Sequence, residues 1–173
     1  MTEPLPSPDT VIDRIGAALK RYCDVVNVTP GNVAKRVNVP TQYGWLLAAG
    51  RAVPADSLLR LAGTLSIDPD TGHPASPQTP PWRGPILWPF FATGLRGRLL
   101  IDRLTVRDAA QISGTSAATV CRASNGMVVN VSSFLRLSRF LRHHPNEWAV
   151  CADSPPAPKV FHEFSPLKQR IPA

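Results

Sequence analysis

The sequence has few cysteines, and their spacing gives them no structural role. Its 173 residues include three, Cys23, Cys121 and Cys151, which lie far apart and contain no C-x-x-C pair. A disulfide framework or a zinc site needs cysteines that are closer together and more numerous. We therefore expect three reduced thiols in a cytoplasmic protein, without a metal or another cofactor.

Long apolar runs and catalytic motifs are missing as well. No apolar stretch approaches the roughly 20 residues that a membrane span requires, and Met1–Asp9 lacks the basic and apolar parts of a signal peptide. Only two acids lie between Asp70 and Glu147, and the sequence has no phosphate-binding glycine-rich loop, no G-x-S-x-G and no H-E-x-x-H. These absences predict a protein that is neither a membrane protein nor an enzyme.

Positive charge is present in excess. Lys and Arg number 19 against 12 Asp and Glu, which gives a net charge of +7 and a pI near 10.0. This balance suits a polyanionic partner, because each Lys or Arg placed at a phosphate releases condensed counterions. Charge alone is also common in proteins that bind no nucleic acid, so it leaves the partner open.

Proline divides the chain into segments. Most of the 19 prolines lie in the two tails and in one central stretch. Proline removes a backbone donor and disfavours helix at the preceding residue, so these stretches are not expected to be ordinary helices. The predicted organisation is a flexible tail at 1–9, a first domain at 10–67, an extended linker at 68–89, a second domain at 90–151 and a C-terminal tail at 152–173.

The two proline-poor segments resemble each other. A shift of 76 residues without a gap places Thr29–Pro69 on Thr105–Pro145, and ten of these 41 pairs are identical. Composition alone would supply roughly one identity in fifteen. The period is longer than that of solenoid repeats, so it predicts two small domains rather than an array. The identical pairs are Thr29/Thr105, Ala34/Ala110, Gly50/Gly126, Val53/Val129, Ser57/Ser133, Leu59/Leu135, Arg60/Arg136, Leu61/Leu137, Leu65/Leu141 and Pro69/Pro145.

Each repeat is predicted to consist of short helices, because apolar residues recur at helical spacing and β-branched alternation is rare. The first repeat is expected to hold an apolar stripe along Val11–Cys23 and helices at 30–37, 41–49 and 55–65. The second is expected to hold a stripe along Phe91–Leu99 and helices at 106–113, 117–125 and 132–142. The predicted fold class is all-α.

One motif in the second repeat carries most of the functional information. It reads LTVRDAAQISGTSAATVCRASNG at 104–126. Ala110 is small where two helices are expected to cross, Gly114 permits the positive φ of a tight turn, and the Ser116 hydroxyl is suited to cap the next helix. Val120 and Ala123 are expected to pack inward. The segment resembles the helix-turn-helix of the Cro/phage-repressor, or xenobiotic-response-element, family.

This resemblance implies two tandem lambda-repressor-like helix-turn-helix domains that bind double-stranded DNA, the third helix of each repeat reading the major groove. Arg122 is then expected to bind a guanine, the small alanines of that helix to meet thymine methyl groups, and Arg107 to hold a phosphate. In the more degenerate first repeat, Thr41 and Gln42 occupy base-reading positions. The implied DNA-binding residues are Arg107, Ser116, Ala117, Ala118, Thr119, Arg122, Thr41, Gln42, Tyr43, Lys35, Arg36 and Arg51.

Several aromatic and basic residues allow two interpretations. Tyr43 and Trp45 are either exposed contacts, or Trp45 fills the space that Gly44 leaves. The three arginines Arg136, Arg139 and Arg142 form either a phosphate patch or a merely solvated face. The aromatic end of the linker, Trp82–Phe91, is expected to pack on the second repeat.

The sequence thus predicts a sequence-specific transcriptional regulator, a repressor of phage or mobile-element type. The two repeats are expected to form a covalent pseudo-dimer or a two-headed reader, and association into a homodimer stays open. The alternative is a helix-turn-helix-fold interaction module, an inhibitor or adaptor, that does not bind DNA. Exposed aromatics at Tyr43 and Trp45 would favour it, since aromatic residues are enriched in protein interfaces.

Overall fold

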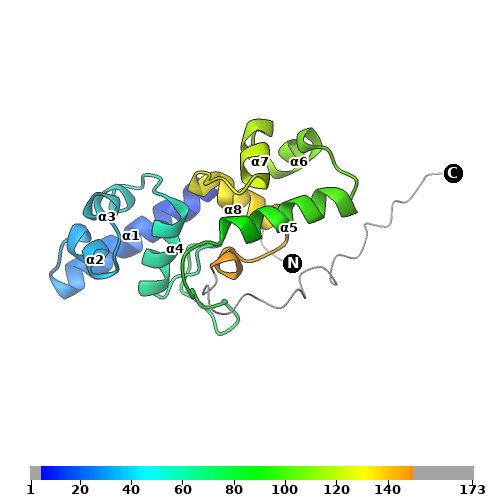
Figure 1. Cartoon of the computed structure of the whole chain (residues 1–173). Helices are drawn as coiled ribbons and strands as arrows, with labels where there is room; N and C mark the ends of the chain where they lie inside the picture. Colours follow the sequence, from blue (N-terminus) through cyan, green and yellow to red (C-terminus); the bar gives the residue numbers. More distant parts are fainter. Residues whose placement is uncertain (1–4, 150–173) are drawn as a thin grey trace.

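The computed structural model describes residues 5–149, in which all regular structure is helical and no strand occurs. The prediction of an all-α fold is confirmed (Figure 1). None of the described helices has the length and apolar character that a bilayer crossing requires. Cys151 and the predicted tail at 152–173 lie outside the described residues, as do residues 1–4 of the first tail. The helices are α1 (Pro8–Val26), α2 (Pro30–Arg36), α3 (Thr41–Ala48), α4 (Ala55–Thr64), α5 (Trp88–Ile101), α6 (Val106–Ser113), α7 (Ala117–Ser124) and α8 (Val131–Phe140), followed by the 3-10 turn η1 (Pro145–Trp148).

The 76-residue repeat extends to the backbone conformation. The bounds of α3 and α7, and those of α4 and α8, lie 76 residues apart. A positive φ is uncommon in residues other than glycine, and residues with a positive φ, glycines among them, occur at matching positions of the two halves. The matching pairs are Asn27 with Arg103, Asn38 with Gly114, Gly50 with Gly126 and Ser66 with Arg142. The predicted positive φ at Gly114, 67°, is thereby confirmed, and the same backbone path is present twice.

Equivalent residues of the two halves meet at both ends of α4 and α8, which pack against each other. Before the two helices, Pro54 and Asn130 form an isolated antiparallel bridge. After them, His144 Nε2 lies 2.9 Å from Asp68 Oδ1. Each of these residues therefore contacts the residue 76 positions away, which is its own counterpart. Such self-pairing is the property of an isologous interface, and it places an approximate two-fold axis between α4 and α8.

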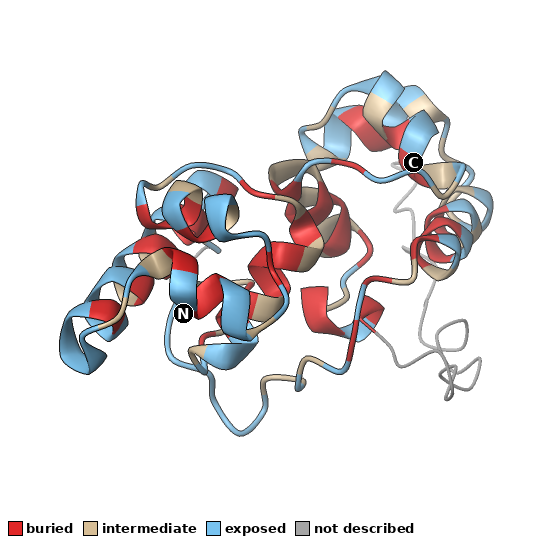
Figure 2. Ribbon diagram, turned by 60° about the vertical axis from the view of Figure 1, so that its left-hand side comes forward, coloured by how far each residue is buried: buried red, intermediate tan, exposed pale blue. Residues whose placement is uncertain are grey.

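The buried side chains of both halves belong to one hydrophobic core. The residues at the predicted spacing in α1, from Val11 to Cys23, are buried, and α8 packs against both α1 and α4. Around Phe91, ring centroids lie 5.4 Å away in Phe134 and 5.0 Å away in Trp148. Figure 2 shows buried residues on the inner faces of helices from both halves, with exposed residues outside. The packing is therefore continuous across the predicted boundary at 68–89, and the shared core leads us to expect the two halves to unfold together.

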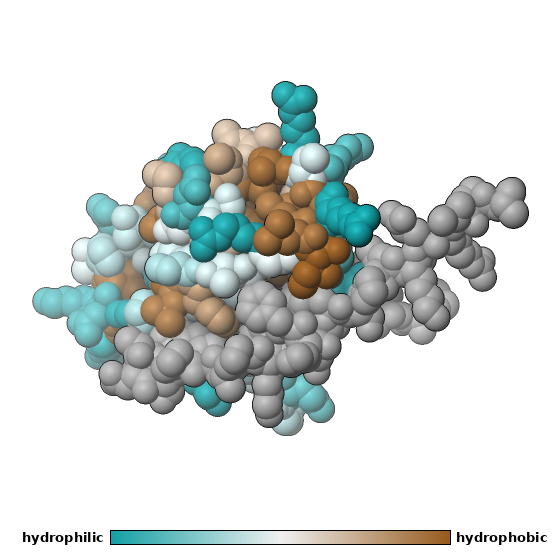
Figure 3. All heavy atoms as spheres, turned by 45° about the vertical axis from the view of Figure 1, so that its right-hand side comes forward, coloured by the Kyte–Doolittle hydropathy of each residue, from teal (hydrophilic) through white to brown (hydrophobic). Residues whose placement is uncertain are grey.

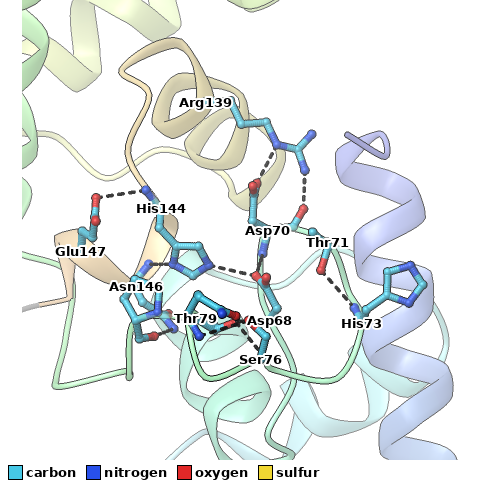
Figure 4. A network of polar contacts seen from close by, with 12 residues as sticks. Asp68, Asp70, Thr71, His73, Ser76, Thr79, Arg139, His144, Asn146 and Glu147 are labelled. Atoms are coloured by element: carbon cyan, nitrogen blue, oxygen red, sulfur yellow. Dashed lines mark hydrogen bonds and ion pairs between the residues drawn. The ribbon is translucent and has the colours of Figure 1, made fainter. Parts of the chain in front are cut away.

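Residues 68–89 differ from the extended linker that their proline content predicts. Asp70 Oδ1 accepts a hydrogen bond from Arg139 Nε at 2.7 Å, and both side chains are less than one-fifth exposed. Asp68 contacts His144 beside this pair (Figure 4). Prolines deprive the segment of backbone donors, but α8 and the residues before η1 supply side-chain partners from about 70 positions away. Arg14 of α1 also donates to the Thr71 carbonyl at 2.9 Å, so side chains of both halves hold the segment and it is no free tether.

The aromatic end of this segment is divided between the two halves. Trp88 and Phe91 lie in the core with α5, as predicted for the second repeat. Trp82 instead lies against α4 of the first half, where its Cβ approaches the position of a Cβ on Gly63 to 3.2 Å. The Arg60 guanidinium stands 5.2 Å from the centroid of the Trp82 ring. The expectation that Trp82 packs on the second repeat is therefore wrong, because a glycine and an arginine of α4 provide its site.

We expect Arg139→Met to lower the free energy of unfolding of the whole chain by about 2–3 kcal/mol, because it leaves the half-buried Asp70 carboxylate without its cation. Urea unfolding should remain a single transition, with far-UV circular dichroism and tryptophan fluorescence coinciding, since the two halves share one core. Arg83→Met, at an exposed position, is the control and should change stability by less than about 0.5 kcal/mol. Two separated transitions would show that the halves unfold independently.

Asp68 provides a test by pH. Burial raises the pKa of this carboxyl group, but hydrogen bonds from His144 and from the Asp70 N–H, together with the charge of His144, outweigh burial and lower the pKa below its ordinary value. A lowered pKa in the folded state stabilises the fold above the unfolded pKa, near 4, and this contribution is lost as the pH falls through the folded value. We expect the free energy of unfolding of the wild type to exceed that of Asp68→Asn by about 1–2 kcal/mol at pH 7.

That difference should shrink below about pH 4 and vanish when both states are protonated. The experiment measures the urea unfolding of both proteins at a series of pH values from about 2.5 to about 7. Asp24→Asn, at an exposed position of α1, should equal wild type at every pH. A wild-type advantage that grows toward low pH would contradict the assignment.

Candidate nucleic-acid interface

The helix pair α6–α7 is defined by its caps. Thr105 caps α6 and forms a reciprocal capping box with Asp108: the Asp108 N–H donates to Thr105 Oγ1 at 3.2 Å, and the Thr105 N–H donates to Asp108 Oδ2 at 2.8 Å. The turn at Gly114 follows, and Ser116 Oγ accepts from the Thr119 N–H at 3.1 Å, which confirms the predicted cap. Neither helix exceeds eight residues, so these caps supply much of the local order.

The helix α7 has one buried and one exposed face. Val120 and Ala123 are fully buried, as predicted, and Ala110 of α6 is 7% exposed where the two helices approach each other. The exposed face consists of Ala117, Ala118, Cys121 and Arg122, with Thr119 half-buried at its edge. Apart from Arg122, the exposed face carries only short side chains. A flat partner surface can therefore approach this helix closely, with one long donor available.

The helix pair α2–α3 repeats this path with a different junction. Thr29 caps α2 by accepting from the Asn32 N–H at 3.2 Å, whereas Pro40 at the start of α3 provides no side-chain cap. A Cβ on Gly44 would lie 2.2 Å from the Pro30 carbonyl oxygen, so the glycine is required for the close approach of the two helices. Its counterpart in the second half is Val120. The first pair thus closes through backbone contact where the second pair uses a side chain.

The position of Trp45 settles one of the alternatives. The space beside Gly44 is occupied by the backbone of α2, so Trp45 does not fill it. Trp45 is 54% exposed, and its indole edge lies against Gly31 of α2. Tyr43 is half-buried and packs on the core. Trp45 is therefore an exposed aromatic on the outer side of the first helix pair.

Charge on both helix pairs is predominantly positive. The first pair and its following loop carry Lys35, Arg36 and Arg51, all exposed, and no acid occurs from residue 25 to residue 55. The second pair carries the exposed Arg107 and Arg122. Its single acid is Asp108, whose pKa is lowered by hydrogen bonds from the Thr105 side chain and backbone. The hydrogen bonds engage this carboxylate in the cap of α6.

Equivalent arginines brace the turn of each pair. Arg60 Nη1 donates to Val37 O at 3.1 Å and to Asn38 O at 3.2 Å, and Arg136 Nη1 donates to Gly114 O, the counterpart of Asn38 O. Both repeats have arginine at this position, and this was the sequence feature that could have indicated the bracing role. Arg136 is therefore not merely solvated, because its guanidinium group holds the turn at Gly114.

The other two arginines of the predicted patch, Arg139 and Arg142, have different surroundings. Arg139 belongs to the ion pair with Asp70. Arg142 is exposed and lies beyond the end of α8. Neither a common phosphate patch nor a common solvated face describes Arg136, Arg139 and Arg142, because contacts distant in sequence engage the first two.

The predicted DNA-binding residues fall into two groups, one on each helix pair. Figure 1 shows α2 and α3 at one end of the molecule and α6 and α7 at another place, so the groups form two separate surfaces. Exposed positions are Arg107, Ser116, Ala117, Ala118, Arg122, Thr41, Gln42, Lys35, Arg36 and Arg51. Half-buried positions are Thr119 and Tyr43. The residues that the sequence analysis missed are structural: the capping acid Asp108, which a Thr-x-x-acid spacing could have indicated, and the bracing Arg60 and Arg136.

Comparison of the chain with models of protein families, with curated proteins and with solved structures finds no match in any of the three.

Proposed function

We propose that the chain is a sequence-specific DNA-binding regulator of transcription, a repressor of phage or mobile-element type, that reads DNA with α3 and α7. The observation that carries this proposal is the repeated helix pair. Each pair consists of a short first helix, a turn with a positive φ, and a second helix whose first turns are exposed. In a helix-turn-helix, this second helix lies in the major groove and its N-terminal residues contact base edges. The two pairs are accordingly proposed to be helix-turn-helix units.

The approximate two-fold axis supports the same proposal. Repressors that bind as dimers place the axis of the protein on the axis of a palindromic operator, with half-sites one helical turn, about 34 Å, apart. Here the two units are parts of one chain and are related by the pairs Pro54–Asn130 and Asp68–His144. The expected operator is an imperfect inverted repeat, because α3 and α7 present different residues. A single chain then occupies both half-sites without a partner subunit.

The two reading helices offer different chemistry. Arg122 on α7 is suited to donate two hydrogen bonds to guanine O6 and N7, and the alanines at the start of α7 are suited to contact thymine methyl groups. Gln42 on α3 is suited to adenine. Lys35, Arg36 and Arg51 around α3 are proposed to contact phosphates, as is Arg107 at the start of α6.

The proposal predicts a steep dependence of DNA affinity on salt. If each unit neutralises three or four phosphates, the logarithm of the association constant should fall against the logarithm of salt concentration with a slope of about −5 to −7. Fluorescence anisotropy of labelled genomic fragments, selected from a random pool by the full chain, measures this slope. An absence of binding to every fragment at low salt, or an affinity that salt does not change, would refute the proposal.

A second prediction concerns the two reading helices. Arg122→Ala should weaken binding to the selected operator by about 1–3 kcal/mol and relax the preference at one base position. Gln42→Ala should cost less, since α3 has no side-chain cap and carries the bulky exposed Trp45. Arg83→Ala removes an exposed charge in the connecting segment and is the control, expected to retain the preference at every position. Equal losses from Arg122→Ala and Gln42→Ala would show that both helices read bases equally.

A protein-interaction module is the second candidate function, favoured by the 54% exposure of Trp45 beside the half-buried Tyr43. Exposed tryptophan is enriched in protein interfaces. In that case no genomic fragment would bind at low salt, and Trp45→Ala would abolish association with a protein partner. On the DNA proposal, Trp45→Ala alters operator affinity without creating or removing any such association.

A further inference from the structure

A pocket of about 970 Å³ lies between the end of α5, α6 and α8. Its apolar lining is formed by Ile101, Leu104, Ile112 and Phe140. Ile101 is 40% exposed and Ile112 is 63% exposed, which is unusual for side chains of this size. Figure 3, in which the right-hand side of Figure 1 comes forward, shows an apolar patch bordered by hydrophilic side chains. No residue of α7 lines the pocket, so it is distinct from the proposed reading face.

Arginines form the polar part of the same pocket. Two of its five, Arg98 and Arg139, are in ion pairs with Asp102 and Asp70. Arg103 and Arg142 also line it, are exposed, and make no side-chain hydrogen bond or ion pair with another described residue. An apolar floor beside two exposed guanidinium groups is complementary to a molecule that has both an apolar body and an acidic group.

The repeat shows what kind of body fits. Arg136 and Arg139 of the pocket correspond, 76 residues earlier, to Arg60 and Gly63. At that position in the first half the chain supplies an aromatic ring: the indole of Trp82, which stacks on Arg60 and contacts Gly63. Arg60 and Arg136 donate to equivalent carbonyls, so their guanidinium groups are held in the same way. In the described part of the second half, no aromatic side chain stacks on Arg136.

We propose that this pocket binds an aromatic organic anion. The ring of the ligand stacks on the Arg136 guanidinium, a favoured partner of aromatic faces, although Arg139 stands where the first half has Gly63. Its carboxylate, sulfonate or phosphate group is bound by Arg103 and Arg142. Ile112 and Leu104 cover the apolar part. The inference does not depend on DNA binding, because the pocket is complete within the chain itself.

The probe for this site is 8-anilinonaphthalene-1-sulfonate, titrated into the full-length chain and followed by its fluorescence. We expect saturable binding at one site per chain. N-phenyl-1-naphthylamine, which has the same rings without the sulfonate, should bind at least about tenfold more weakly. The double variant Arg103→Gln/Arg142→Gln should weaken binding of the anionic probe by about tenfold or more, a loss of about 1.4 kcal/mol or more. Ile112→Glu should weaken it to a similar degree.

The matched control, Lys20→Gln/Arg83→Gln, removes the same net charge at exposed positions away from the pocket and should bind as wild type does. Near-UV circular dichroism establishes that each variant keeps the native packing. If the double variant does not fold, two results still test the ligand site: the affinities of the two probes for the wild type, and the binding of the anionic probe by the Ile112→Glu variant. Equal affinity for both probes, an equal loss in the control, or no saturation would overturn the proposal.

Sedimentation velocity tests whether this face instead binds a second copy of the chain. If the wild-type chain is a dimer at micromolar concentration that Ile112→Glu converts to a monomer, this face is an interface between copies of the chain. That outcome would also overturn the ligand site.

Discussion

The burial of α8 is the constraint on which the rest of the structure depends. Val131, Phe134, Leu135 and Leu137 are all fully buried, although the helix has ten residues. It packs against α1 and α4 of the first half, and against α6 and η1 of its own half. Each large apolar side chain that is fully buried contributes about 1.5–3 kcal/mol. A change that displaces α8 would therefore separate the halves and remove the support of the second helix pair together.

Local signals were sufficient to predict the helices. The periodic apolar positions, Gly114 and the cap Ser116 predicted α3, α4 and α7 to within two residues at each end. The face of α7 that the resemblance assigns to DNA is exposed, and Val120 is buried beneath it. Function itself, including the roles of Arg122 and Gln42, is outside what these local signals determine.

What the sequence could not indicate depends on partners distant along the chain. The pairing of Asp70 with Arg139 joins residues 69 positions apart. Proline content correctly excludes helix from most of 68–89, but it does not show that side chains from α8 fix the segment. In the same way, Gly44 looks like a missing core residue until the carbonyl of Pro30 is placed beside it. Local composition determines which conformations are excluded, and only the tertiary contacts decide between those that remain.

Because the two related units are parts of one chain, they can keep a symmetric arrangement and still differ in sequence. Two identical subunits must pay an association cost estimated at about 4–15 kcal/mol, and they present the same residues at both sites. Here the equivalent pairs Pro54–Asn130 and Asp68–His144 keep the arrangement of a dimer while the units differ freely in sequence.

The differences lie at the surfaces rather than in the frame. Both halves keep the left-handed turn positions and the bracing arginine. The first half covers α4 with Trp82 beside Gly63, whereas the second half has Arg139 in place of that glycine and a pocket beside Arg136. The helix α3 carries an exposed Trp45 where α7 carries Cys121, its smaller counterpart. Because the left-handed turn positions lie outside α3 and α7, the exposed faces of these helices can change without loss of the fold. The repeat therefore provides two surfaces of fixed relative placement and independent chemistry.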